Sequence, residues 1–447
     1  MANDIVAPSP GGLLTPTGMG PTSGMPDMSA PMNGNRPSSS IQGRSYTDKN
    51  TPQGRMLWQI NKWEYYYCAY FDEGGFSDKT VLTKAINELD DQFMERRNYS
   101  VYPNYVRPII DATYTPVFTK PAKRITTVNG KEDTDGTAAP IWAAFRKDVD
   151  HRGSDMPTMA ERFTKHARIL GVSYVIGDAP REVSASESNA VVDLVKDRKY
   201  PWISMRLPQQ VIQELLVLDD FCNLQEIVFI EADDRTTGEP RAKKWTKEYC
   251  CMMKKDKKTS AWVEMNETRV VYYLESVPVI PIISSESQDA TVIPKSQFAS
   301  VIDCNLAIFN ILSELRRMGR SQMFPILCLP NMQGTFIASV SNGISLPAND
   351  QNVTYPLPMF LAPDVSPYES IKETINFLVG ELIRVSGQQG VLGVPKSGPA
   401  TQAPSGIEAS FEFMGQNWVL LKSADIAEKV EKAIVKLIKL YVPEPFE

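Results

Sequence analysis

The sequence predicts a mixed α+β protein, and three of its features indicate this class. Apolar residues recur at three-and-four spacing in two long segments near the C-terminal end, which predicts amphipathic helices. Residues 224–283 alternate short strand-like runs with turn residues, which predicts an antiparallel meander. The chain has 447 residues, 42% of them hydrophobic, so it can bury more than one core and form two or three lobes.

The N-terminal part combines a polar arm with helices. Residues 1–50 are dominated by Pro, Gly, Ser, Met and Asn, which predicts a flexible arm that a neighbouring subunit or partner would hold in place. From Arg55 to Gly74-Gly75 a helix carries so many aromatic residues that we expect it to be buried on several sides. The elements expected next are a helix at 78–96, an extended or broken-helix segment at 105–128, a helix at 157–170 and a strand at 172–176.

The predicted meander contains a basic cluster with two interpretations. Its strands are expected at 225–231, 244–253, 260–266 and 269–276. The basic residues are Arg241, Lys243, Lys244, Lys247, Lys254, Lys255, Lys257 and Lys258. They could form a nucleic-acid patch, but neighbouring acids such as Asp233, Asp234 and Glu239 cancel much of their charge. We favour the solvated side of a hairpin.

The C-terminal part predicts a helical hairpin with an insert at its tip. The first helix covers 297–320 and is roughly 35 Å long at about 1.5 Å per residue. The second begins at Ser366-Pro367, with an N-cap and a first-position proline, and ends at Ser386-Gly387. Between them, residues 322–363 hold short apolar runs among Pro, Asn and Gly turns, which predicts a small β-rich knob.

The glycine-rich loop after Gly387 does not match a nucleotide-binding motif. Lys396-Ser397 follows glycines, but Val394-Pro395 stands where a phosphate loop requires its second glycine. The loop also follows a helix, whereas a phosphate loop follows a strand. A final helix is predicted at about 407–442, with an apolar face opposite a lysine-rich one.

Composition argues against several classes of protein. The net charge is −6 and the pI is about 5.4, whereas proteins that grip nucleic acid tightly carry a basic stripe. The six cysteines lack CxxC spacing and the chain has two histidines, which argues against a zinc site and removes the commonest general base. Without a membrane-spanning apolar run or a secretory signal, we expect a soluble protein made in the cytoplasm.

Three segments, taken in order, carry a resemblance to a known family. They are ARILGVSYVIGDAP, VIPKSQFASVIDCNLAIFNILSELRRMGRSQMFPIL and APSGIEASFEF. They resemble, respectively, the wing segment, the start of the stem and the end of the tunnel loop in the portal (head–tail connector) proteins of tailed bacteriophages. Each motif is weak alone, but their order is fairly specific and covers nearly the whole chain from about Arg55.

The resemblance implies a mixed α+β portal fold that assembles as a ring. Many portal proteins continue into further wing strands and a helical crown, so the crown is expected to be short or absent before Glu447. The implied parts are a flexible N-terminal arm (1–50), a helical and β wing (51–293), a first stem helix (294–321), a small β-rich clip (322–363), a second stem helix (364–387), a tunnel loop (388–406) and a tunnel helix (407–447).

The same resemblance implies that the protein is a viral portal and not an enzyme. It is expected to form a ring, a dodecamer, at one capsid vertex, through which double-stranded DNA is packaged and ejected without sequence recognition. The implied partners are the terminase large subunit, the tail adaptor and the major capsid protein, with no cofactor, no metal and no membrane. The expected location is the virion, and the host cytoplasm during assembly.

Simple geometry agrees with a DNA channel. Twelve helices, each about 10 Å wide, form a circle roughly 38 Å across between axes and leave about 28 Å clear. A duplex about 20 Å wide fits with little spare room. Because tight neutralisation of phosphates would stall sliding DNA, the acidic balance suits such a channel better than a sequence-specific reader.

The resemblance also assigns candidate site residues. The polar face of the second stem helix and the following loop supply the DNA-channel candidates Lys372, Arg384, Gln388, Gln389 and Lys396. The tunnel-loop residues are Gly390, Gly393, Gly398, Ser405 and Gly406. The clip candidates for contact with the motor or adaptor are Asn331, Gln333, Asn349 and Asp350. As an alternative, Lys372 and Arg384 pair with nearby glutamates at helical spacing, and the clip residues are plain exposed turns.

Two other functions remain open at this point. A DNA-processing enzyme could use paired carboxylates such as Asp233-Asp234 or Asp90-Asp91 for a metal, although no third ligand stands at a convincing spacing. Another virion structural subunit, such as a tail adaptor or capsid protein, would form no open channel. Metal-dependent cleavage would favour the first, and end-on images without a bore would favour the second.

Overall fold

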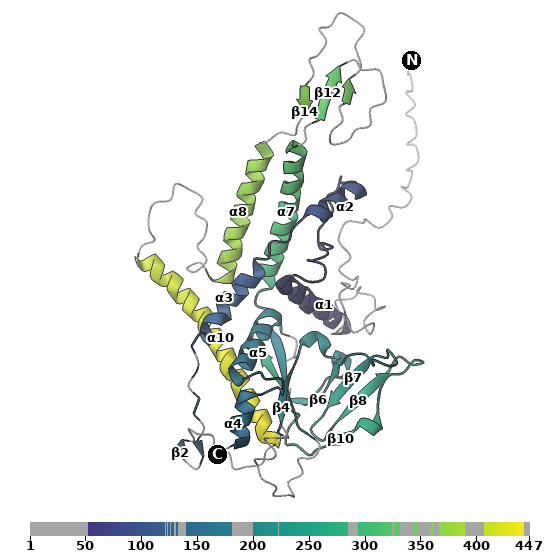
Figure 1. Ribbon diagram of the computed structural model, residues 1–447, viewed down its shortest axis with the longest axis vertical. Coiled ribbons are helices and arrows are strands. Elements are labelled where there is room, and N and C mark those ends of the chain that lie inside the picture. The colour runs from purple at the N-terminus through teal and green to yellow at the C-terminus, as the bar shows by residue number, and fades with distance from the viewer. Residues whose placement is uncertain are drawn as a thin grey trace, which may run out of the picture.

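The computed structural model in Figure 1 describes most of the predicted folded part of the chain. The described residues are 52–120, 122, 124–125, 127–128, 131–132, 140–180, 200–221, 223–284, 294–323, 326–330, 344–346, 359–361, 366–388 and 406–441. The predicted arm, residues 1–50, lies outside the described residues.

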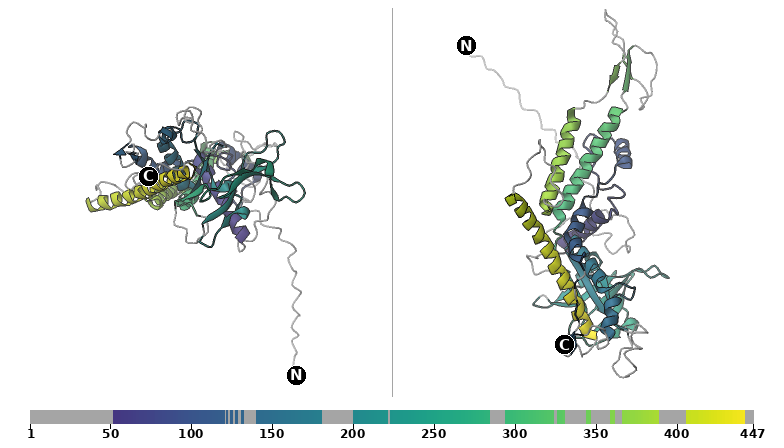
Figure 2. Two further views of the ribbon diagram at one scale, coloured as in Figure 1. Left: turned by 90° about the horizontal axis from the view of Figure 1, so that it is seen from below. Right: turned by 60° about the vertical axis from the view of Figure 1, so that its left-hand side comes forward.

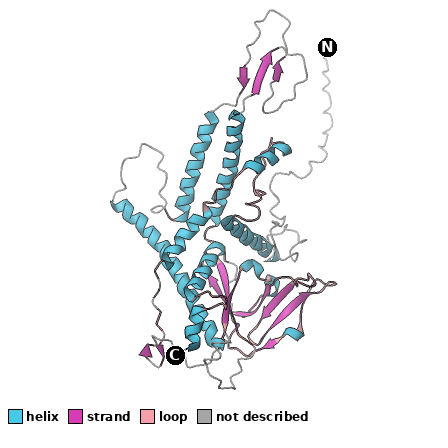
Figure 3. Ribbon diagram, in the orientation of Figure 1, coloured by secondary structure: helices cyan, strands magenta, loops and turns pink. Residues whose placement is uncertain are grey.

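Helices and strands are both abundant in the described residues (Figure 3), so the predicted mixed α+β class is confirmed. The α-helices are α1 (Pro52–Phe71), α2 (Asp90–Tyr99), α3 (Val106–Phe118), α4 (Pro140–Lys147), α5 (Met156–Leu170), α7 (Ala299–Met323), α8 (Ser366–Ser386) and α10 (Gly406–Tyr441). Short 3-10 turns are η1 (Pro208–Gln210), η2 (Gln213–Leu215) and η3 (Asn266–Thr268).

The described strands form four sheets. A three-stranded antiparallel sheet has the order β11-β3-β4, with β3 (Val172–Asp178), β4 (Trp202–Arg206) and β11 (Val279–Ile283). The antiparallel six-stranded sheet has the order β10-β8-β7-β6-β5, with β9 on β8, and comprises β5 (Val217–Leu218), β6 (Leu224–Ile230), β7 (Arg241–Trp245), β8 (Tyr249–Lys255), β9 (Trp262–Glu264) and β10 (Val270–Val271). The two small sheets are β1 (Thr127–Val128) with β2 (Lys131–Glu132), and β13 (Ile344–Leu346), β12 (Ile326–Pro330) and β14 (Met359–Leu361).

The turn from α5 into β3 is determined by local chemistry. Asp155 caps α5 by accepting a hydrogen bond from the Thr158 amide, and Gly171 ends the helix in the left-handed region with φ of 92°. All but the last residue of β3 is buried, and β3 lies between β4 and β11. The helix and strand predicted at 157–170 and 172–176 are therefore confirmed.

The larger of two main cores is rich in aromatic side chains from α1. Trp63, Tyr65 and Tyr70 are almost fully buried and pack with residues of α3, β3, β6 and α7. Tyr70 donates a hydrogen bond to the Asp111 carboxylate, so its polar end is also satisfied. The expectation that this helix is buried on several sides is confirmed.

The second core joins α10 to the three-stranded sheet. Residues from the C-terminal half of α10, such as Ile434 and Leu437, pack with Phe145 of α4 and Phe163 of α5. At its end, the Tyr441 hydroxyl donates a hydrogen bond of 3.0 Å to the Gly177 carbonyl in β3. Figure 2 shows that the other end of α10 projects away from this body.

The structure differs from the prediction in two helical segments, one in where the helix begins and one in the kind of structure. The helix expected at 78–96 begins only at Asp90, because residues 74–89 form turns in which Lys79 has a positive φ of 59°. The segment expected to be extended or broken holds α3, an unbroken helix. Pro108 lies in its first turn, where an amide hydrogen is not needed, and Pro116 lies near its end, while the buried face includes Ile109 and Ile110.

The meander is confirmed as antiparallel, but two of its strands were joined in the prediction. The run expected at 244–253 is a hairpin in which β7 pairs with β8. Its turn forms because the Thr246 hydroxyl accepts hydrogen bonds from the amides of Glu248 and Tyr249. The last strand, β11, leaves this sheet and pairs with β3.

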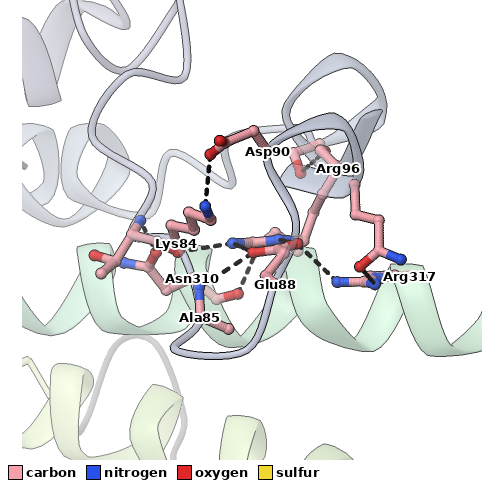
Figure 4. A network of polar contacts seen from close by, with 11 residues as sticks. Lys84, Ala85, Glu88, Asp90, Arg96, Asn310 and Arg317 are labelled. Atoms are coloured by element: carbon pink, nitrogen blue, oxygen red, sulfur yellow. Dashed lines mark hydrogen bonds and ion pairs between the residues drawn. The ribbon is translucent and has the colours of Figure 1, made fainter. Parts of the chain in front are cut away.

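A buried ion pair between α2 and the turn before it, with its bonds to Ser313 and Arg317, fixes α2 on α7 (Figure 4). The Arg96 guanidinium donates to both carboxylate oxygens of Glu88 at 2.9 and 2.8 Å, and these side chains are each 1% exposed. Arg96 also donates to Ser313 of α7, and Arg317 of α7 donates to Glu88 at 2.7 Å. Burial alone raises the pKa of Glu88, but hydrogen bonds from Arg96 and the Ala85 amide and the two arginine charges lower it overall, so Glu88 stays charged.

Candidate functional site

The most extended feature of the molecule is a helical hairpin, α7 and α8, that rises from the body with a small sheet beyond its tip (Figure 1). α7 has 25 residues and α8 has 21, so the hairpin is on the order of 30 to 40 Å long at about 1.5 Å per residue. The predicted bounds of both helices are confirmed to within a few residues.

Apolar packing holds the hairpin together. Ile375, Leu378, Val379 and Leu382 of α8 recur at three-and-four spacing and pack against the larger core. Across the seam, the Cys304 thiol of α7 donates to the Leu378 carbonyl at 3.6 Å. The two helices therefore form one packed element, with α2 on the other side of α7 and the outer face of α8 exposed.

Both channel candidates on α8 are exposed, and both have a glutamate partner. Lys372 is paired with Glu369 at 3.7 Å, with side chains 57% and 68% exposed. Arg384 is paired with Glu381 at 2.7 Å, and its side chain is 60% exposed. Pairs this exposed contribute little to stability, so both cations remain available to a ligand. Twelve residues separate them, a rotation of about 120° at 3.6 residues per turn, so they do not share one stripe.

Gln388 does not have the exposure that the sequence suggested. Its side chain is buried, with 2% of the residue exposed, and its amide nitrogen donates a hydrogen bond of 2.6 Å to the Ile109 carbonyl of α3. The prediction that it faces a channel is wrong for this side chain, because the bond to α3 holds it inside the protein. Gln388 instead fixes the end of α8 to the body.

The other candidates lie almost entirely outside the described residues. Gly406 is the first residue of α10. The candidates that the structure does not describe are Gln389, Gly390, Gly393, Lys396, Gly398, Ser405, Asn331, Gln333, Asn349 and Asp350. For these, the sequence-based roles stay predictions.

Half of the basic cluster of the meander forms ion pairs with acids. Lys243 bonds Asp178 at 2.9 Å, and Lys244 bonds both Glu226 and Glu264, at 2.7 and 2.9 Å. Burial alone lowers the pKa of Lys244, but hydrogen bonds to these two glutamates raise it overall. Arg241 and Lys257 pair with Asp234 and Glu239, so the charges of these four cations are offset locally, which agrees with a solvated hairpin face.

One member of each carboxylate pair considered for a metal is engaged elsewhere. Asp90 bonds Lys84 at 2.5 Å, and Asp234 pairs with Arg241 and accepts the amide of Thr236. Within the described part of the chain, no group of three or more His, Cys, Asp or Glu residues has the geometry to hold a metal ion.

The sequence reasoning missed an exposed apolar stripe on α10. Met414, Trp418 and Leu421 are 63%, 60% and 66% exposed and lie at i, i+4 and i+7 on one face. On α8, Phe377 is likewise 64% exposed. The signal was present as a second apolar face of α10, opposite the one that packs on the body. Such a stripe marks a surface for contact with another macromolecule.

Neither a scan against protein-family models nor a search of curated proteins gave a match to this chain. Among the helices of the described residues, none combines the length and apolar character required to span a lipid bilayer. The features of the molecule that bear on its function are therefore the hairpin, its exposed faces and the order of the elements.

Proposed function

We propose that this protein is the portal subunit of a tailed bacteriophage, a structural protein without catalytic activity. Twelve copies form a ring at one capsid vertex, and double-stranded DNA passes through its centre during packaging and ejection. The terminase motor and later the tail adaptor dock on the clip, and the major capsid protein surrounds the wing. The protein acts in the virion after assembly in the host cytoplasm.

One observation carries the proposal: the order of elements along the chain. A helical and β body is followed by a long antiparallel hairpin with a small sheet beyond its tip, and then by a long helix that returns to the body. This order supports the assignment of the body as the wing, the hairpin as the stem, the small sheet as the clip and the long helix as the tunnel helix of a portal protein. The hairpin is long and narrow, with α2 packed on one side of it and the outer face of α8 exposed on the other.

The charge of the hairpin supports a channel in which DNA slides. Lys372 and Arg384 are exposed, but each has a glutamate within ion-pair distance. The two lie about 120° apart on α8, and Arg384 shares a face with Phe377, so the duplex is expected to pass Lys372 and to compete with Glu369 for that cation. Weak, replaceable contacts of this kind let DNA move, whereas unpaired cations would hold phosphates and release counterions at each site.

End-on images of the purified full-length protein test the proposal. We expect closed rings with an open centre, because heterologous contacts that close generate cyclic assemblies. Native mass measurement on the same sample gives the number of subunits. A monomer, or a particle with no central opening, would rule out the portal function.

A substitution in the loop between α8 and α10 tests the predicted tunnel. We expect replacement of residues 389–403 by Gly and Ser residues of equal number to leave rings intact and to reduce the DNA content of assembled particles. The reason is that this segment joins the channel face of α8 to α10 and, in the proposed ring, lies against the DNA. Normal DNA content in rings of the variant would contradict the tunnel role.

The length of the replacement must be kept. Val419 lies against Gly387, and thirteen helical residues separate it from Gly406, a rise of about 20 Å at about 1.5 Å per residue. If a deletion leaves only two residues between Gln388 and Gly406, that link can span only about 10 Å, at roughly 3.5 Å per residue. Such a deletion would unwind α10, so its effect on packaging would not report on the loop. Gln388 is retained because it fixes α8 to α3.

A further inference from the structure

α7 lies between two other helices that pack on its opposite faces. On one face, Cys304 contacts the Leu378 carbonyl of α8, and on the other, Ser313 contacts Arg96 of α2. Nine residues separate Cys304 from Ser313, a rotation of about 180° at 3.6 residues per turn. The views in Figures 1 and 2 agree that α2, α7 and α8 follow one another in a layer. This layer has two outer edges, one on α8 and one on α2.

The α8 edge is apolar at its centre. Phe377 is two residues from both Ile375 and Val379. At about 100° per residue, that places it about 200° around the helix from each of them, on the opposite face of α8. Since Ile375 and Val379 pack into the core, Phe377 points away from α7, and it is 64% exposed. Phenylalanine on the outer face of a long helix is the kind of side chain that a neighbouring macromolecule buries.

The α2 edge is also apolar. Met94 lies about 200° from Arg96, at about 100° per residue, so it is on the face of α2 that turns away from α7. It is 51% exposed, and Ile86 and Leu89 in the preceding turn are 101% and 67% exposed. Met94 thus lies on the side of α2 that faces away from α7, and two more large apolar side chains are exposed in the turn that leads into α2.

α10 passes the C-terminal end of α8, and its own exposed apolar surface covers only part of its length. Its side chain Val419 lies against Gly387, directly after α8. The exposed stripe of Met414, Trp418 and Leu421 is followed on the same face, at the same spacing of three and four residues, by Asp425, Glu428 and Lys432. These three charged residues are also exposed. One helical face thus changes from apolar to charged at Asp425, so only the part of the helix before Asp425 has the chemistry of a covered surface.

We propose that the α8–α10 edge of one copy docks on the α2 edge of the next copy, an inference that rests on the proposed ring. The α8–α10 edge is defined by Phe377, Met414, Trp418 and Leu421, and the α2 edge by Ile86, Leu89 and Met94. A second copy fits because a single contact buries both edges and continues the α2–α7–α8 layer. The two edges differ, so the contact is heterologous and propagates around an axis.

Cysteine cross-linking in the full-length chain tests this pairing. Asn87 and Asn376 are exposed next to Ile86 and Phe377, so each can be replaced by cysteine without disturbing a core. With a short bis-maleimide, we expect the double variant Asn87→Cys/Asn376→Cys to give a ladder of covalent multimers. Each single variant should give no more product than its parent chain, in which Cys222, Cys304 and Cys328 are replaced by serine and the remaining Cys68, Cys250 and Cys251 are buried. Dimers from either single variant would then show an isologous contact and overturn the proposal.

End-on images of the same samples separate the pairing from the portal function. Rings in which the double variant gives no ladder would overturn the pairing and leave the portal proposal intact. A ladder from open filaments would support the pairing and overturn the portal. Monomeric protein would overturn both.

A charge substitution provides a second readout of the same contact. We expect Phe377→Glu to shift rings to smaller species in native mass measurements, since it places a carboxylate in an apolar contact. Tyr273→Glu is the matched control, because Tyr273 is 85% exposed and follows Tyr272, whose ring lies 6.4 Å from that of Tyr441. Tyr441 ends α10 and is about 30 Å from Leu421 at about 1.5 Å per residue, so rings should persist. Rings of unchanged size and salt resistance in the Phe377→Glu variant would contradict the pairing.

Discussion

Replacing Arg96 with methionine is expected to release α2 from α7. The change leaves the Glu88 carboxylate, 1% exposed, without its bidentate partner. Removal of one member of a buried ion pair typically costs about 3–5 kcal/mol. Because each 1.4 kcal/mol is about a factor of ten, local opening of α2 should increase roughly a hundred-fold or more. Amide hydrogen exchange of residues in α2 and in the facing part of α7 measures this opening directly.

Two further variants show whether burial of the charge is the cause. Lys84→Met removes the partner of Asp90 in a pair whose side chains are 39% and 89% exposed, so the expected loss is below about 1 kcal/mol. The double variant Glu88→Leu/Arg96→Met removes both buried charges and should recover part of the protection lost in Arg96→Met. Equal exchange in Arg96→Met and Lys84→Met would disprove the account.

The elements that could be predicted from sequence are those with a strong local pattern. α7, α8 and the last helix follow apolar spacing, and Ser366-Pro367 marks the start of α8. The turns before α2 could not be predicted in this way. Val81 and Leu82 have helical spacing to later apolar residues, but Glu88 accepts the Ala85 amide with its side chain and turns inward to Arg96. That competition between side chain and backbone depends on a partner in the folded protein.

The candidate site shows the same division between local and distant causes. The exposure of Lys372 and Arg384 was predicted correctly, because helical periodicity fixes the outer face of α8. Gln388 was placed wrongly because its partner, the Ile109 carbonyl, is 279 residues away in the sequence. The exposed stripe of α10 was missed because Met414, Trp418 and Leu421 have the spacing of a buried face, and only the fold shows which of the two faces of α10 is covered.

Replacing Gly171 with alanine is expected to destabilise the body at the point where it meets the hairpin. Gly171 has φ of 92°, a conformation that costs an L-residue roughly 1–2 kcal/mol. An added Cβ would also lie 2.7 Å from the Lys295 carbonyl oxygen and 2.8 Å from its carbonyl carbon, so the backbone leading into α7 must move. Overpacking of this kind adds typically 1–3 kcal/mol, so the total loss is on the order of 2–5 kcal/mol in urea unfolding.

Gly153→Ala separates the two contributions to that loss. Gly153 has a similar φ of 89°, but an added Cβ meets nothing within 4 Å, so only the conformational cost of roughly 1–2 kcal/mol applies. The difference between the variants isolates the collision with Lys295. Because the Gly171 carbonyl accepts hydrogen bonds from both the amide and the hydroxyl of Ser284, the displacement should also loosen the junction that holds α7 on the body. Faster exchange at the start of α7 in Gly171→Ala, and not in Gly153→Ala, is the expected sign of that coupling; equal losses in both variants would show that the Lys295 backbone yields freely.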